Sequence, residues 1–166
     1  RQNEPLKFPW AGGMNSIQFC YIDLDIDGIM DILAFDRRGN RKMCFINNGI
    51  SGEISYEFSP QYSEFIPDFY EWVILADYNM DSRNDIFTYS PGYASVMVYK
   101  NVSDDVLKFE LVVYPYLKTY LEGGYVNLYI SSADYPGIAD VDNDGDLDIL
   151  TYGVNGSFID MHNNMS

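Results

Sequence analysis

The stretch Asp140-Val141-Asp142-Asn143-Asp144-Gly145-Asp146-Leu147-Asp148 places oxygen-bearing side chains at positions 1, 3, 5 and 9 of a nine-residue segment. The same design occurs twice earlier, as Asp23-Leu24-Asp25-Ile26-Asp27-Gly28-Ile29-Met30-Asp31 and as Asp77-Tyr78-Asn79-Met80-Asp81-Ser82-Arg83-Asn84-Asp85. A hard cation such as Ca²⁺ takes roughly six to eight oxygen ligands. Because a tightly curled loop with alternating carboxylates can supply most of these oxygens, the sequence predicts up to three calcium-binding loops.

The expected ligands are the side-chain oxygens at positions 1, 3, 5 and 9 and the backbone carbonyl at position 7. They are Asp23, Asp25, Asp27, Asp31 and the Ile29 carbonyl in loop 1; Asp77, Asn79, Asp81, Asp85 and the Arg83 carbonyl in loop 2; and Asp140, Asp142, Asp144, Asp148 and the Asp146 carbonyl in loop 3. Gly28 and Gly145, at position 6, permit a sharp turn.

Loop 2 departs from the pattern at three positions. Asn79 keeps an oxygen at position 3 but loses a charge. Ser82 replaces the glycine at position 6, which is expected to strain a turn that needs positive φ. Arg83 brings a cation close to the loop. Because ligand charge tunes calcium affinity, we expect loop 2 to bind Ca²⁺ more weakly than its neighbours.

The residues around the loops predict an all-β fold. An EF-hand begins similarly but requires a Glu at position 12 within a helix, and position 12 here is Ala34, Thr88 or Thr151. The flanking residues are short apolar runs rich in β-branched and aromatic residues, which is typical of strands. Each loop is therefore expected to join two strands, with position 9 at the start of the second.

This combination resembles the FG-GAP repeats of integrin α-subunits and, more closely, bacterial VCBS repeats. The strand-like runs ending in Asn47-Asn48-Gly49, in Asn101 and in Asn163-Asn164 fit the same unit. The resemblance implies a β-propeller whose repeats each hold one Ca²⁺. It predicts a partial propeller of about three blades, with repeats near 14–60, 68–112 and 131–166 of a single segment.

The repeat spacing of about 54 and then 63 residues is typical of propeller blades. Three blades leave open edges, since rings usually have about four to eight. We therefore expect the segment to belong to a longer chain, or to close a ring with further copies.

The composition favours a compact acidic domain. The 166 residues are 47% hydrophobic and carry a net charge of −15. An acidic chain without basic patches argues against nucleic acid as a partner, and no apolar run is long enough for membrane insertion.

Other residues are interpreted as structural. Trp10 and Trp72 are expected in the core, and the lone His162 at the surface. Segments 61–70 and 112–121 invite a helix or loop interpretation. Cys20 and Cys44 are expected to be buried free thiols, and a disulfide between them is the alternative.

The favoured function is a non-catalytic, calcium-stabilised propeller segment that serves adhesion, other binding or scaffolding. Millimolar extracellular Ca²⁺ suits such loops, which predicts a secreted or cell-surface location. The expected partner is a protein or a carbohydrate. The first repeat, from Trp10-Ala11-Gly12-Gly13 onward, is similar to secreted bacterial proteins of the type IX secretion kind, which implies a secretion-machinery component as a further partner.

Two other functions remain open. One is an accessory or catalytic propeller of an extracellular lyase or hydrolase with its active site outside this segment. The other is an integrin-like receptor head. The sequence itself contains no Gly-x-Ser-x-Gly elbow, P-loop or Cys-x-x-Cys motif, and no catalytic residue is predicted.

Overall fold

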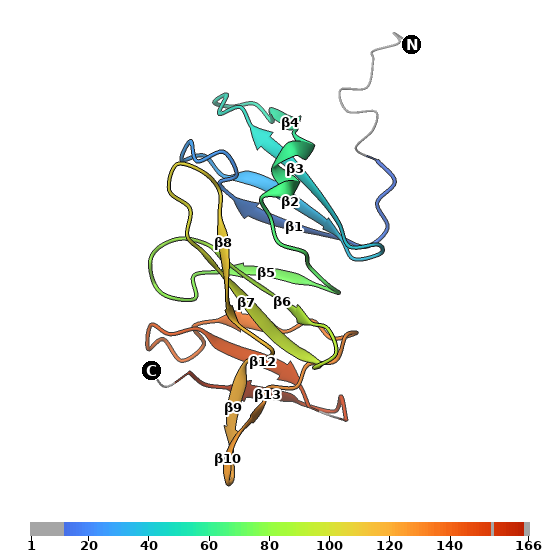
Figure 1. The fold of residues 1–166 in the computed structure, drawn as a ribbon, viewed down its shortest axis with the longest axis vertical. Helices are drawn as coiled ribbons and strands as arrows, with labels where there is room; N and C mark the ends of the chain where they lie inside the picture. Colours follow the sequence, from blue (N-terminus) through green and yellow to red (C-terminus); the bar gives the residue numbers. More distant parts are fainter. Residues whose placement is uncertain (1–11, 154, 165–166) are drawn as a thin grey trace.

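A computed structural model describes residues 12–153 and 155–164 as an all-β protein. Figure 1 shows three antiparallel sheets arranged one after another along the long axis, in chain order. In the described residues the sole helix is the short 3₁₀ helix η1, Pro60–Glu64. Trp10 lies outside the described residues.

Each sheet is built from strands that follow one another in the chain. The first contains β1 (Ile17–Ile22), β2 (Asp31–Asp36), β3 (Arg41–Asn47) and β4 (Tyr56–Phe58); the second contains β5 (Val73–Ala76), β6 (Asp85–Ser90), β7 (Ser95–Asn101) and β8 (Phe109–Val113); the third contains β11 (Gly137–Ala139), β12 (Asp148–Tyr152) and β13 (Ile159–His162). A separate hairpin, β9 (Lys118–Leu121) with β10 (Gly124–Asn127), lies between the second and third sheets in the chain.

The strands predicted on both sides of each loop are confirmed. The helix alternative for 112–121 is wrong, because this segment supplies the end of β8 and all of β9. The β-prone Val112, Val113 and Tyr120 favour the extended conformation, and Pro115 lacks the backbone N–H that a helix interior needs.

Two hydrophobic cores lie between successive sheets. The first joins residues of β1 to β3 with β5 and β6, and the second joins β6 and β7 with Leu128, Ile130 and β12. Strand β6 contributes to both cores, because Ile86 packs in the first core and the next residue, Phe87, packs in the second. Successive strand side chains point to opposite faces, so the second sheet is covered on both faces.

The first strands of the sheets lie near one another, with β5 in contact with β1 and β11. The Gln18 side chain accepts a hydrogen bond from the Val73 backbone N–H at 3.1 Å, and the Tyr135 hydroxyl donates to the Val73 carbonyl at 3.4 Å. These contacts help to fix the order in which the sheets stack.

Both cysteines are free thiols. Cys20 is paired with Leu33 across β1 and β2, and Leu33 is paired with Cys44 across β2 and β3. One strand therefore separates the two sulfurs, a gap of roughly twice the 4.8 Å strand spacing that no disulfide spans. Burial raises the pKa of Cys20 to about 11 and that of Cys44 to about 12.

Trp72 is fully buried, as predicted. His162 is not the surface residue expected from the sequence: it is half-buried, with Thr119 at 2.9 Å from Nδ1 and Thr151 at 3.1 Å from Nε2. Burial lowers its pKa. Within the described ranges, no helix has the length and apolar character needed to cross a bilayer.

Candidate metal centres

The three acidic loops occupy the same place in the three sheets. Each connects the first strand to the second, and its position 9 carboxylate is the first residue of that second strand, as predicted: Asp31 in β2, Asp85 in β6 and Asp148 in β12. All three of these aspartates are fully buried.

The position 9 carboxylate makes the same two hydrogen bonds in every loop. One oxygen accepts the backbone N–H of position 2, at 2.8 Å from Leu24, 2.8 Å from Tyr78 and 3.0 Å from Val141. The other accepts the N–H of an asparagine 16 residues further on, at 2.7 Å from Asn47, 2.6 Å from Asn101 and 3.0 Å from Asn164. Position 9 thus ties the start of the loop to the end of the third strand or, in loop 3, to a residue just beyond that strand.

Position 1 accepts backbone N–H groups from the turn itself. The two carboxylate oxygens of Asp23 accept from Asp27 and Gly28 at 3.1 and 2.9 Å, and Asp77 accepts from Asp81 and Ser82 at 3.0 and 2.6 Å. Asp140 accepts from Gly145 at 3.1 Å. The loop is therefore curled around its first carboxylate.

Positions 4 and 6 have positive φ in all three loops. At position 4 the φ values are 62° for Ile26, 59° for Met80 and 64° for Asn143. At position 6 they are 85° for Gly28, 67° for Ser82 and 100° for Gly145. The predicted strain at Ser82 is thus present, and the β-branched Ile26 is strained as well, because such residues rarely adopt this conformation.

Loops 1 and 3 each bring three carboxylates together. One oxygen from each of Asp23, Asp25 and Asp27 lies within 4.8 Å of the others, and the same holds for Asp140, Asp142 and Asp148. Asp31 and Asp144 lie outside these groups, and across the residues that the structure describes, loop 2 forms no such group.

A buried oxygen without a partner marks position 3 in loops 1 and 2. Neither Asp25 Oδ1 nor Asn79 Oδ1 has a hydrogen-bond partner. Burying a polar atom without a partner costs free energy, so such atoms usually find a water or an ion. Asp25 belongs to the three-carboxylate group, which is the environment that a cation would satisfy.

The carboxylates of loops 1 and 3 crowd one another. Desolvation, followed by the nearby charge of Asp27, raises the pKa of Asp25. Desolvation and the neighbouring Asp144 likewise raise the pKa of Asp142. A bound divalent cation would reverse both effects, because its charge favours the ionised carboxylate.

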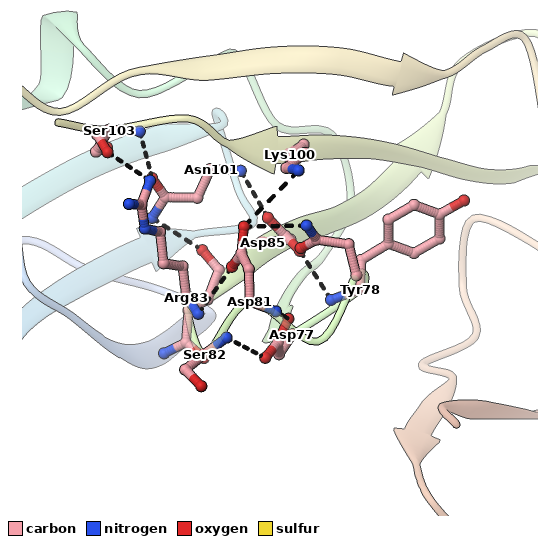
Figure 2. A network of polar contacts seen from close by, with 11 residues as sticks. Asp77, Tyr78, Asp81, Ser82, Arg83, Asp85, Lys100, Asn101 and Ser103 are labelled. Atoms are coloured by element: carbon pink, nitrogen blue, oxygen red, sulfur yellow. Dashed lines mark hydrogen bonds and ion pairs between the residues drawn. The ribbon is translucent and has the colours of Figure 1, made fainter. Parts of the chain in front are cut away.

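In loop 2 the protein itself supplies a cation and an amide to one carboxylate, Asp81 (Figure 2). Asp81 accepts a hydrogen bond from the Asn79 amide at 3.0 Å, and the Lys100 ammonium lies 3.7 Å from the same carboxylate oxygen. Hydrogen bonding from Asn79, with the charge of Lys100 adding to it, lowers the pKa of Asp81. The Arg83 guanidinium turns away to donate to the Ser103 carbonyl.

Two features of these sites were missed from the sequence. The asparagines at the strand ends were seen as a repeated pattern without a role, although the constant spacing of 16 residues from position 9 would have identified them. Lys100 gave no such signal, since its approach to Asp81 depends on the pairing of β6 with β7.

Comparisons with known proteins gave no significant similarity: no protein-family model matches, and neither a curated protein nor a solved structure does.

Proposed function

We propose that this chain is a calcium-stabilised segment of a β-propeller, that loops 1 and 3 are its principal metal sites, and that it serves binding or scaffolding outside the cell. The observation that supports it most is the meeting of three carboxylates in each of these loops, with the Asp25 Oδ1 buried and unpartnered in one of them. Oxygen-only donor sets of this kind suit hard cations.

The stacking of the sheets supports the propeller. Two four-stranded sheets and one three-stranded sheet follow in chain order, each running from a first strand outward, with β5 beside both β1 and β11. Antiparallel sheets repeated around a centre are the architecture of a propeller.

The metal has a structural role in this proposal. In loop 1 it would be held by Asp23, Asp25 and Asp27, and in loop 3 by Asp140, Asp142 and Asp148. Its two positive charges would offset carboxylate repulsion and hold a turn that already contains two positive-φ residues. We propose weaker binding at loop 2, where Lys100 and the Asn79 amide already stabilise Asp81.

Thermal unfolding tests this role. A ligand that binds only the folded state at about 100 times its Kd adds about 2.7 kcal/mol per site. Two such sites would raise the Tm by roughly 10–20 °C in a protein of this size. The melting temperature is therefore expected to fall by this order in EDTA, to recover in excess Ca²⁺, and to recover less in Mg²⁺.

A pair of matched variants locates the effect. Asp25→Asn should remove about half of the calcium-dependent rise in Tm, whereas Glu122→Gln, at the exposed turn between β9 and β10, should leave it unchanged. Equal melting temperatures in EDTA and in Ca²⁺ for the unsubstituted protein would refute structural calcium.

A further inference from the structure

The β9–β10 hairpin forms one wall of a cavity that the calcium loops do not explain. The cavity has a volume of about 530 Å³ and lies between β6, the hairpin and the third sheet. Its apolar floor includes Phe87, Leu128 and Ile149, which are at most 5% exposed. Cavities of about 300–1,000 Å³ with apolar floors are the usual size and character of small-molecule sites.

Two exposed tyrosines stand at the cavity rim. Tyr120 and Tyr125 are directly paired across the hairpin, and their rings meet edge to face with centroids 5.4 Å apart. They are 66% and 75% exposed. Figure 1 shows the hairpin projecting beyond the third sheet. A tyrosine offers an apolar ring together with a hydroxyl, which suits a ligand that is apolar on one face and polar at its edge.

The polar part of the lining comes from β9 of the hairpin and from β13 and the residue that follows it, and hydrogen bonds hold it in place. It includes Lys118, Thr119, His162 and Asn163. The His162 ring lies between the hydroxyls of Thr119 and Thr151, so it fastens the hairpin to the third sheet. The Asn163 amide donates to Asp142 at 3.3 Å. The polar groups are thus presented by anchored elements, which reduces the entropy cost of binding.

The cavity also differs from the rest of the protein in charge. The chain has 25 acidic residues and a net charge of −15, yet the described residues that line the cavity include no Asp or Glu and include Lys118. Such a lining does not favour a cationic ligand. It suits a neutral or anionic ligand. Such a ligand can accept hydrogen bonds from Lys118, and it can both donate to and accept from the hydroxyl and amide groups of the lining.

We propose that this cavity, with Tyr120 and Tyr125 at its rim, binds a pyranose ring of a glycan. A sugar ring presents axial C–H groups that lie against an aromatic face and hydroxyls around its edge that both donate and accept. The tyrosine rim and the apolar floor match the first property, and the wall of Lys118, Thr119 and Asn163 matches the second. The proposal rests on the binding role proposed above and gives it a ligand class and a place.

Saturation-transfer difference NMR of the whole chain tests it. The probes are cellohexaose, chitohexaose, mannohexaose and a galacturonate hexasaccharide, each at about 10 mM so that Kd values in the millimolar range are detected. At least one probe is expected to show saturation of its ring protons. Transfer to the galacturonate alone would assign an acidic glycan, and transfer to a neutral probe a neutral one; both support the site.

The variants test the location. Tyr120→Ala and Tyr125→Ala should each weaken binding of the responding probe at least about tenfold, a loss of about 1.4 kcal/mol, while Tyr120→Phe should retain most of it. Tyr21→Ala removes an equally exposed tyrosine from β1, away from the cavity, and should have no effect. Circular dichroism and the melting temperature report whether each variant is folded.

The proposal is overturned if no probe receives saturation, or if a probe binds equally well to both folded alanine variants. Neither result touches the calcium sites, whose test is the melting temperature in EDTA and in Ca²⁺. A change of Tm with calcium but no sugar binding would therefore refute the glycan site alone.

Discussion

Loop 2 has nearly the same backbone as loops 1 and 3 but a different way of balancing its charge. All three loops share the position 9 hydrogen bonds and the two positive-φ residues. In loops 1 and 3 three carboxylates meet. In loop 2 Asn79 and Lys100 stabilise Asp81 instead.

The difference separates the shape of the loop from the meeting of carboxylates that a cation would need. The shape follows from hydrogen bonds between carboxylates and backbone N–H groups, which loop 2 retains with a serine at position 6 and an amide at position 3. In our proposal, metal affinity would depend on how many negative charges converge without a protein cation nearby. Substitutions can therefore change the shape of the loop or its charge separately.

The largest effect is expected at position 9 of loop 2. Asp85→Ala leaves the N–H groups of Tyr78 and Asn101 without their acceptor at a fully buried site. Each unsatisfied buried group costs about 1–3 kcal/mol, so the two groups together should lower the free energy of unfolding in urea by about 2–6 kcal/mol. Because this bond pattern needs no metal, the loss should be similar in Ca²⁺ and in EDTA.

Asp31→Ala makes the equivalent change at position 9 of loop 1. Its loss of unfolding free energy should equal that of Asp85→Ala in EDTA and exceed it in Ca²⁺, because loop 1 would also lose its proposed cation. An exposed-site control, Glu122→Ala at the turn between β9 and β10, should change the stability by less than about 0.5 kcal/mol. A loss of that small size for Asp85→Ala would show that position 9 does not hold the loop together.

A smaller effect is expected at position 6. Gly145→Ala should destabilise the protein by about 1 kcal/mol, since a left-handed conformation disfavours any side chain. A Cβ at Gly145 would meet no atom within 4 Å, so the cost comes from the backbone alone. Ser82→Gly should have the opposite sign and stabilise by about 0.5 kcal/mol, because part of the strain relief is offset by unfolded-state entropy.

Urea unfolding of these two variants checks the sign, with Gly12→Ala as the control, since Gly12 has open space and no positive φ. If Ser82→Gly is the less stable protein, the turn is not strained in loop 2 and the equivalence of the three backbones is wrong.

The sequence predicted the strands, the loop positions and the place of each position 9 residue. These follow from local signals: β-branched and aromatic runs, Asp at fixed offsets and glycine at the sharpest point of the turn. The serine at position 6 of loop 2, where the other two loops have glycine, also predicted strain at Ser82.

The rest depends on contacts that no local pattern shows. Lys100 meets Asp81 only through strand pairing, and Asp144 lies outside the carboxylate group although its spacing is correct. His162 looked isolated in the sequence, but its two partners come from β9 and β12. The first strand of the hairpin was hidden in segment 112–121, where one proline and three tyrosines gave conflicting signals.

Isothermal titration of the metal-free chain with Ca²⁺ tests the central claim most directly. We expect two tight equivalents, one fewer after Asp25→Asn or Asp142→Asn, and three after Asn79→Asp is combined with Lys100→Met, which gives loop 2 a further charge and removes its cation. No tight binding, or an unchanged stoichiometry in both single variants, would contradict the proposal that loops 1 and 3 are calcium sites.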